Sequence, residues 1–253
     1  MRRRARALCV ALLAAGACAL GLPAAAADDG GLLRIAHLSP NTPAVDAYVA
    51  PVGDPAAMTV LRGVSYGTIS AYRRVPSGTY TVALRATGAG ASTPPALAAT
   101  VRVRSLSART VAAVSSFATL RLDVLSDDLA PPPTGKARLR VISAAAAAKA
   151  LDAFLAGGLR LAATLPFAST SGYVDVAAGA ATLEIAPNGT SRTVEPVMLA
   201  AGSVYSAVVL DKVGGGLVVR TVLDAASPGV TPVGGVETGA GGAAPAVGGL
   251  TAA

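Results

Sequence analysis

The segment LRIAHLSPNTPAVDAYVA (residues 33–50) occurs a second time, in altered form, as LRVISAAAAAKALDAFLA (residues 139–156). The two segments align without a gap at an offset of 106 residues. The identical pairs include Leu33 with Leu139, Arg34 with Arg140, Asp46 with Asp152 and Ala47 with Ala153. A period of about 100 residues is too long for a solenoid repeat, so the pattern predicts a duplicated small domain.

The duplication continues after the second copy shortens by five residues, at an offset of 101. The matched positions are Tyr66 with Phe167, Tyr72 with Tyr173 and Gly78 with Gly179. A third segment, SARTVAA from Ser107, matches AGSVYSA from Ala201 only in pattern. We therefore predict two tandem modules, module 1 (residues 32–129) and a more divergent module 2 (residues 137–225).

Within both modules, short apolar alternations are broken by Gly, Pro, Ser and Asp, which is typical of strands and turns. In residues 79–85, for example, Tyr80, Val82 and Leu84 would share one face of a strand. Such patterns indicate antiparallel sheets with one face in water. The sequence thus predicts an all-β fold, made of two immunoglobulin-like antiparallel β-sandwiches.

Residues 143–156 have the strongest helix propensity in the chain. The equivalent segment of module 1 contains Pro40 and Pro43, which cannot lie within a continuous helix. We therefore expect residues 150–156 to be extended, while a helical turn within residues 144–148 stays open.

A linker and a C-terminal tail lie outside the modules. Residues 130–136 (APPPTGK) form a Pro-rich linker that favours extended, semi-rigid polyproline II geometry, so we expect each module to fold separately. Residues 226–253 contain no aromatic residue, Lys or Arg. Their Gly, Pro and Ala content predicts a disordered tail.

Residues 1–27 have the features of a secretory signal peptide: four arginines, an apolar run and the small residues AAAA before Asp28. The apolar run is short for a membrane span, so we expect cleavage after Ala27 and a secreted protein without a span in the mature chain. Cys18 lies in AGAC, which is similar to a lipoprotein cleavage site. Ala15 stands where that site normally has Leu, so an unlipidated mature chain is preferred.

Residues 1–27 contain four of the 21 basic residues and none of the 14 acidic residues. Removing them therefore lowers the formal charge from +7 to 17 − 14 = +3. The mature sequence has a small positive charge and no cluster of Lys and Arg, so it does not predict a nucleic-acid-binding surface. Both cysteines also lie in the leader, so the exported chain has no disulfide. The Ala-rich composition is typical of a GC-rich genome such as an actinobacterial one, and we expect a monomer.

The motif RIAHLSPNTPAVDAYV (residues 34–49) resembles the HxSPxxPxVDxYV motif that opens modules of domain-of-unknown-function family 4397. Residues 64–84 resemble the second block of that family, an aromatic-Gly pair followed by a Pro-x-Gly-x-Tyr hairpin. The resemblance covers residues 33–125 well and 137–224 loosely. It implies a secreted bacterial β-sandwich and no particular activity.

Module 2 replaces His37 with Ser143 and fills the following loop with alanines. Because the polar loop occurs only in module 1, a ligand site would involve His37, Ser39, Asn41 and Asp46. Asp46 is the weaker member, since Asp152 preserves it and indicates a structural role. His37, Ser39 and Asp46 could be arranged as a hydrolase, but no G-x-S-x-G motif surrounds any serine.

No catalytic, cofactor or metal residue is predicted. A single histidine and no mature cysteine exclude a conventional zinc site. The pairs Asp28–Asp29 and Asp127–Asp128 lie in no calcium-binding loop pattern and are interpreted as solvated turns. Thr238 and Gly239 in the tail are similar to the end of a sortase signal, although no hydrophobic helix and basic stop follow.

These observations favour a non-catalytic, exported structural or interaction protein of the cell envelope, such as a spacer or adhesin, with an unknown envelope or extracellular partner. The alternative is a secreted carbohydrate- or peptide-binding protein that uses the loops of module 1. A hydrolase based on His37 is the remote alternative.

Overall fold

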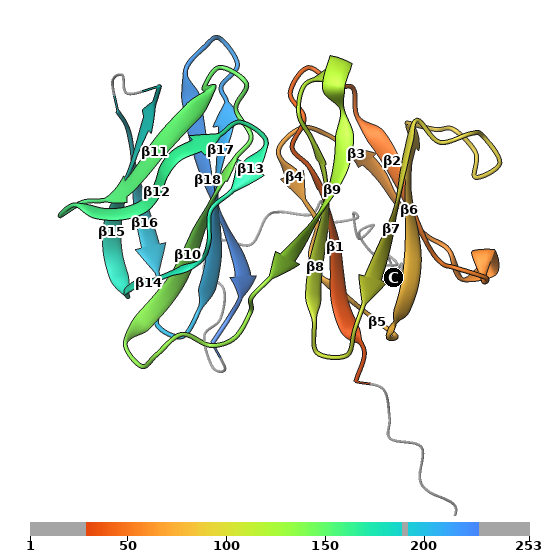
Figure 1. The fold of residues 1–253 in the computed structure, drawn as a ribbon, viewed down its shortest axis with the longest axis horizontal. Coiled ribbons are helices and arrows are strands. Elements are labelled where there is room, and N and C mark those ends of the chain that lie inside the picture. The colour runs from red at the N-terminus through yellow and green to blue at the C-terminus, as the bar shows by residue number, and fades with distance from the viewer. Residues whose placement is uncertain (1–28, 189–191, 228–253) are drawn as a thin grey trace, which may run out of the picture.

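The structure is a computed structural model that describes residues 29–188 and 192–227 (Figure 1). These residues form strands and two short 3-10 helices, so the all-β prediction is confirmed. No helix in the described part of the chain is long and apolar enough to cross a membrane. The predicted signal peptide, Cys18, Thr238 and Gly239 lie outside the described residues.

Module 1 contains a five-stranded sheet, in which β4 and β5 both pair with β1 in the order β4/β5-β1-β8-β9, and a four-stranded sheet, β3-β2-β6-β7. Its elements are β1 (Gly31–His37), β2 (Val45–Pro51), η1 (Pro55–Ala57), β3 (Thr59–Val64), β4 (Thr68–Ile69), β5 (Arg73–Val75), β6 (Gly78–Ala86), β7 (Leu97–Val103), β8 (Ala108–Val114), η2 (Phe117–Thr119) and β9 (Arg121–Asp127).

Module 2 repeats this topology, with sheets β13/β14-β10-β17-β18 and β12-β11-β15-β16. Its strands are β10 (Lys136–Ser143), β11 (Ala150–Leu155), β12 (Leu159–Pro166), β13 (Ser169–Thr170), β14 (Val174–Ala177), β15 (Gly179–Pro187), β16 (Thr193–Leu199), β17 (Val204–Asp211) and β18 (Leu217–Ala225). The expected strand at residues 150–156 is therefore present. Residues 146–147 form a turn, and tertiary pairing overrides the helix propensity of this segment.

The expectation of purely antiparallel sheets is wrong at one place in each module. Strand β1 pairs with β8 in parallel, and β10 pairs with β17 in parallel. The first strand of each sandwich thus runs alongside the next-to-last one. A parallel neighbour needs a long connection, and here the rest of the module supplies it.

This pairing also corrects the third segment of the repeat. Leu33 lies opposite Arg109, while its equivalent Leu139 lies opposite Tyr205. The true offset in this segment is therefore 96 residues, rather than the 94 obtained by matching Ser107 with Ala201. A slip of two residues keeps every side chain on the same face of a strand, which is why the apolar pattern did not detect it.

Three apolar clusters stabilise the molecule. Two of them fill the interiors of the sandwiches. The third lies between the modules, where the two five-stranded sheets face each other (Figure 1). Its fully buried members are Ala36, Leu38, Ala112, Val114, Ile142, Ala144, Val208 and Leu210.

The third cluster explains why the central strands do not have the predicted wet face. The alternation is observed in β6, where Tyr80, Val82 and Leu84 are buried. In β8 and β17, by contrast, nearly every residue is buried, because the second face is covered by the other module. Separate folding of the modules stays a prediction, and each module alone would expose this apolar face to water.

Candidate functional site

The polar loop that follows β1 is bonded mainly to itself. The His37 side chain is buried, and its Nε2 donates to the carbonyl oxygen of Pro43 at 3.2 Å. The backbone N–H of Ser39 points to His37 Nδ1 at 3.4 Å, so the ring is a neutral tautomer protonated on Nε2. The Ser39 hydroxyl is buried and bonded to Thr42 Oγ1 at 2.7 Å. Burial lowers the pKa of His37, although its bond to Pro43 opposes this shift.

Asp46 anchors a bulge in the neighbouring strand. Its carboxylate accepts from the backbone N–H of Gly63 at 2.8 Å and of Gly88 at 3.0 Å, and Arg62 approaches at 3.3 Å. The bond from Gly63, followed by the one from Gly88, lowers the pKa of Asp46. In module 2, Asp152 accepts from the backbone N–H of Thr164 at 2.9 Å. Both copies thus use this aspartate to hold a strand at a bulge.

The four residues of the predicted ligand loop therefore do not converge on a shared cleft. Apart from the bond from the Ser39 N–H to His37, the side chains of His37, Ser39 and Asp46 bond to different groups, and of the four residues only Asn41 is exposed. Asn41 has a φ of 57° and occupies the turn of the loop. Ligand binding by this loop stays a prediction, and the observed bonds describe scaffold.

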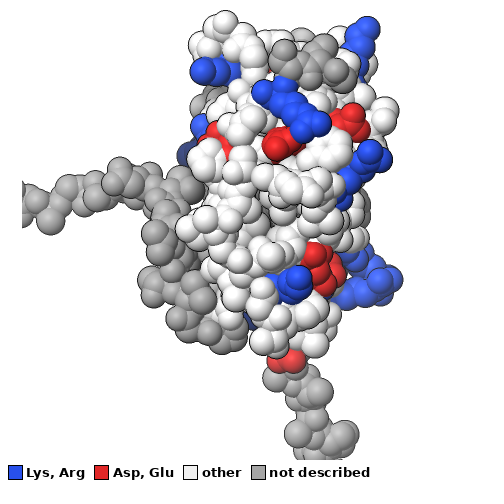
Figure 2. Space-filling model, turned by 90° about the vertical axis from the view of Figure 1, so that its left-hand side faces the viewer, with Lys and Arg blue, Asp and Glu red and all other residues white. Residues whose placement is uncertain are grey.

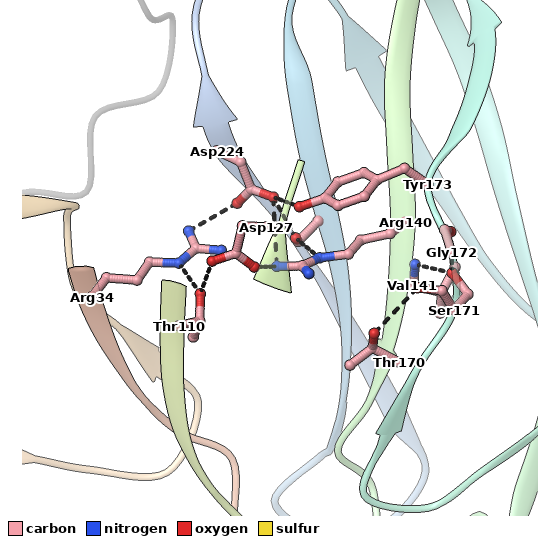
Figure 3. Close-up of polar contacts among 11 residues, drawn as sticks. Arg34, Thr110, Asp127, Arg140, Val141, Thr170, Ser171, Gly172, Tyr173 and Asp224 are labelled. Carbon is pink, nitrogen blue, oxygen red and sulfur yellow. Dashed lines mark hydrogen bonds and ion pairs between the residues drawn. The ribbon is translucent and has the colours of Figure 1, made fainter. Parts of the chain in front are cut away.

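A second group of polar residues, not predicted from the sequence, lies buried between the modules (Figure 3). In module 1, Arg34 Nε donates to Thr110 Oγ1 at 2.8 Å, and Thr110 Oγ1 donates to Asp127 Oδ2 at 2.6 Å. Arg34 extends from β1, Thr110 from β8 and Asp127 from the end of β9. Neighbouring strands of one sheet thus present an arginine, a hydroxyl and a carboxylate on the face that meets module 2.

The equivalent strands of module 2 present the same set. Arg140 Nε donates to Ser206 Oγ at 2.8 Å, and Ser206 Oγ donates to Asp224 Oδ2 at 2.5 Å. The corrected offset pairs Ser206 with Thr110, so each residue of one set has its counterpart in the other. The duplication has therefore preserved a complete polar set on each facing sheet.

The two sets bind each other reciprocally. Arg34 Nη1 lies 2.8 Å from Asp224 Oδ1, and Arg140 Nη2 lies 2.7 Å from Asp127 Oδ1 (Figure 3). Each arginine thus holds the hydroxyl of its own module and the carboxylate of the other. Arg140 also lies 3.9 Å from Asp224 Oδ2 of its own module. The four charged side chains are almost completely buried and sum to zero charge. We name these residues, with the two hydroxyls and the tyrosines described next, the reciprocal cluster.

A tyrosine flanks each arginine. The Arg34 guanidinium lies 4.3 Å from the centre of the Tyr72 ring, and that of Arg140 lies 4.7 Å from Tyr173. The Tyr173 hydroxyl also donates to Asp224 Oδ2 at 3.1 Å. Burial raises the pKa of both tyrosines. Although burial would lower the pKa of Arg140, Asp127 and its other neighbours raise it, so the guanidinium stays charged.

The cluster corrects the interpretation of Asp127 as a solvated turn residue. Its side chain is fully buried, whereas that of Asp128 is largely exposed. The matched arginines and tyrosines were visible in the repeat, but the pairing between modules was not, because it depends on how the two sheets face each other. A charged residue at a repeated strand position was the available signal.

A groove of about 420 Å³ opens at one end of the interface between the modules. Its floor is apolar and includes Leu38, Val114, Leu125 and Ile142. Its polar residues come from both modules, with Arg121 and Asp123 on β9 and Ser143, Ser169 and Thr170 on β10 and β13. Arg121 Nε lies 3.0 Å from Asp123 Oδ1, and both side chains are partly exposed.

Figure 2 views the molecule from the side of module 2. Basic and acidic side chains are interspersed on this face, and uncharged surface lies between them. No group of three or more His, Cys, Asp or Glu residues that could hold a metal ion occurs in the described parts of the chain. The interface between the modules therefore has two polar features, the buried reciprocal cluster and the open groove.

Residues 31–154 match the model of a family described as a domain of unknown function, DUF4397. The match supports the family assignment predicted from the HxSPxxPxVDxYV motif. It runs from β1 through the linker and into β11, so it crosses the boundary between the modules. No curated protein matches the chain.

Several solved structures are similar at a low level. The TIE protein of Bacillus anthracis is 14% identical, with 71% of this chain and 33% of that chain covered and a TM-score of 0.25. A family CBM26 domain of Eubacterium rectale Amy13K, solved with maltoheptaose, is 12% identical over 78% of this chain and 98% of its own, with a TM-score of 0.24. A putative cell adhesion protein from Bacteroides ovatus is 11% identical over 76% and 95%, with a TM-score of 0.22. This chain therefore spans a third of the length of the TIE protein.

Proposed function

We propose that the protein is an exported, non-catalytic structural or interaction protein of the cell envelope, in which the two modules act as one rigid spacer. The reciprocal cluster is the observation that carries this proposal. A buried ion pair adds little net stability, but it penalises every arrangement that leaves a charge unpaired. The cluster therefore selects one angle between the modules, as a spacer requires.

The bonds of the polar loop support the non-catalytic part of the proposal. A hydrolase would need a serine hydroxyl beside a histidine and a carboxylate beside that ring. In this chain the Ser39 hydroxyl bonds to Thr42, and the Asp46 carboxylate bonds to the bulge at Gly63. The Ser39 hydroxyl and the Asp46 carboxylate therefore stabilise the loop and the bulge.

Cell fractionation tests the location. We expect the protein in the washed cell-wall fraction, with a mature chain that begins near Asp28, rather than at a lipidated Cys18. A pool found entirely in the culture medium would contradict the envelope role. If the tail attaches the protein to the wall, Thr238→Ala moves it to the medium without changing its stability.

The groove favours a second candidate function, a secreted protein that binds carbohydrate or peptide. Its volume falls in the range of about 300–1,000 Å³ that is typical of small-molecule sites, which often lie between domains. In this version of the hypothesis the site is formed by both modules, rather than by the loop around His37 alone. A protein released into the medium that binds a ligand in solution is the expected result.

A further inference from the structure

The interface between the modules has two ends that the duplication makes equivalent, and the groove opens at one of them. The groove lies where β9 faces β13. At the opposite end, β18 faces the β3–β4 turn of module 1. Comparing the two ends shows which substitutions created the groove.

The opposite end is closed by Tyr66 and Gly67. The Tyr66 hydroxyl donates to the carbonyl oxygen of Ala144 at 2.8 Å and accepts from the backbone N–H of Asp211 at 2.8 Å, both in module 2. Gly67 has a φ of 82°, and a Cβ at this position would lie 3.0 Å from Leu210 Cδ1. Module 1 therefore packs directly onto module 2 at this end.

At the groove, some equivalents of these residues are smaller or less polar, although Leu38 and Ala168 stand where the closed end has Ala144 and Gly67. Phe167 takes the place of Tyr66 and has no hydroxyl, and Val114 takes the place of the larger Leu210. The polarity of the wall also differs between the two ends. Arg121 and Asp123 stand where β18 has Val218 and Arg220, and Thr170 stands where β4 has Ile69. One end of a nearly symmetric interface thus has a groove whose wall carries hydrogen-bonding side chains.

We infer that this groove binds a neutral saccharide of one or two rings. A sugar ring presents an apolar C–H face and a rim of hydroxyls, each a donor and an acceptor. The groove offers an apolar floor for the ring and a polar wall for the hydroxyls. Arg121 and Asp123 bond each other through two contacts of 3.0 Å, and Arg121 Nη2 also donates to the carbonyl oxygen of Ala168 at 3.3 Å. A sugar hydroxyl would accept from Arg121 Nη1, and a second would donate to a remaining lone pair of the Asp123 carboxylate through charge-assisted hydrogen bonds.

The charge of the groove distinguishes a saccharide from other small ligands. Arg121 and Asp123 cancel, so neither an anion nor a cation is favoured. An extended peptide would bind by pairing with the edge of β9, which is the last strand of its sheet, and the peptide probe of the titration tests that alternative. The groups that line the groove beside β9 are polar side chains, which match sugar hydroxyls. This inference rests on the second candidate function and names its ligand class.

Saccharide titration of the purified full chain, with its leader removed, tests the inference. The probes are glucose, galactose, N-acetylglucosamine, maltose and cellobiose, with N-acetyl-trialanine amide as the peptide comparison. We expect at least one sugar to produce saturable NMR shift changes in residues of β9 and β13. A millimolar dissociation constant or a tighter one supports the inference.

Two variants locate the binding. Asp123→Asn removes the acceptor charge and should weaken binding roughly tenfold, which is the effect of losing one charge-assisted hydrogen bond. Thr170→Ile, which copies Ile69 of the closed end, should weaken it similarly. Asp175→Asn is the matched control, because Asp175 is also an exposed partner of an arginine, at 2.7 Å from Arg138 Nε, but lies outside the groove.

The inference is overturned if none of the sugars binds, if the peptide alone binds, or if both groove variants bind as well as Asp175→Asn. These outcomes are independent of the envelope proposal, since a wall-bound protein that binds no sugar refutes the groove site alone. A freely secreted protein that binds sugar at the groove refutes only the spacer.

Discussion

The two modules have kept one set of polar residues and changed another. Arg34 and Arg140 occupy equivalent positions, and each binds a carboxylate of the other module. His37, by contrast, has become Ser143, although the strands on either side are retained. The preserved residues face the second module, and the changed residue belongs to a loop that bonds mainly to itself. The comparison indicates that contact between the modules, more than the loop, has constrained this duplicated chain.

The largest expected effect comes from breaking the reciprocal cluster. Arg140→Met leaves Asp127 without its ion pair in a buried position, so the free energy of unfolding should fall by about 3–5 kcal/mol in urea denaturation. Arg34→Met should cost less, because Asp224 keeps Arg140 at 3.9 Å and the hydrogen bonds from Ser206 and Tyr173. A loss in both variants, larger for Arg140→Met, would confirm that each arginine is bound by the carboxylate of the other module.

A matched control is Arg121→Met, which removes an arginine that is half exposed and paired with Asp123. It should cost at most about 1 kcal/mol. If Arg140→Met is no more harmful than Arg121→Met, the modules do not depend on the cluster and are better described as independent units.

The next effect concerns the closed end of the interface. Tyr66→Phe removes the hydroxyl that serves the Ala144 carbonyl and the Asp211 N–H, and should cost about 1–3 kcal/mol. Burial raises the pKa of Tyr66 to about 12, so its hydroxyl keeps its proton at neutral pH. The variant also copies the phenyl ring of Phe167, so it makes the two ends of the interface more alike.

Tyr48→Phe provides the comparison, because the Tyr48 hydroxyl donates to the Ala89 carbonyl within module 1. Both variants lower stability, but only Tyr66→Phe should change the backbone amide NMR shifts of Ala144 and Asp211. Unchanged shifts at these residues would show that Tyr66 does not couple the modules.

The order of these effects reflects what the sequence could and could not reveal. Alternation in β6 and the duplication sufficed to predict an all-β fold of two sandwiches. The alternation in β1 is just as regular, yet Arg34 is buried, because its face of the strand meets a second module. Burial of that face is a property of the assembled pair, and no local pattern within one module records it.

The candidate site shows the same limit. The sequence drew attention to His37 because it is polar and absent from module 2, but its bonds are local. The groove was missed because its wall combines Asp123 with Thr170, which are far apart along the chain and belong to different modules. Asp46 was predicted to have a structural role from its repeat in Asp152, and hydrogen bonds to the backbone are what the structure shows.

The two repeated aspartates allow a finer comparison of the modules. Asp46→Asn places an amide N–H₂ against one of two backbone donors, since both carboxylate oxygens accept from the backbone. Asp152 uses one oxygen for Thr164, and an asparagine can keep this bond. Asp46→Asn should therefore lower the urea midpoint more than Asp152→Asn. An equal shift would contradict the assignment of two backbone bonds to Asp46.

Acid titration checks the same residue. Because hydrogen bonds lower the folded-state pKa of Asp46 below 3.8, its contribution to stability is present above pH 3.8 and is lost as the pH falls through the lowered value. The wild-type protein should therefore lose more stability between neutral pH and pH 3 than Asp46→Asn does.

The smallest expected effect comes from the loop itself, and His37 makes it measurable because it is the only histidine of the chain. Burial places the folded-state pKa of His37 below 6.5, whereas the unfolded chain keeps the ordinary value. As the pH falls below 6.5, the unfolded chain takes up the proton first, so the free energy of unfolding decreases until the folded-state pKa is reached. His37→Gln keeps a donor for Pro43 and removes this titration, so the wild-type protein should lose more stability than the variant between pH 7 and pH 5.

Ser143→Ala, at the equivalent position of module 2, should leave the pH dependence unchanged. A His37→Gln profile parallel to that of the wild type would mean that the histidine is accessible and titrates normally, and would return the loop to consideration as a binding site.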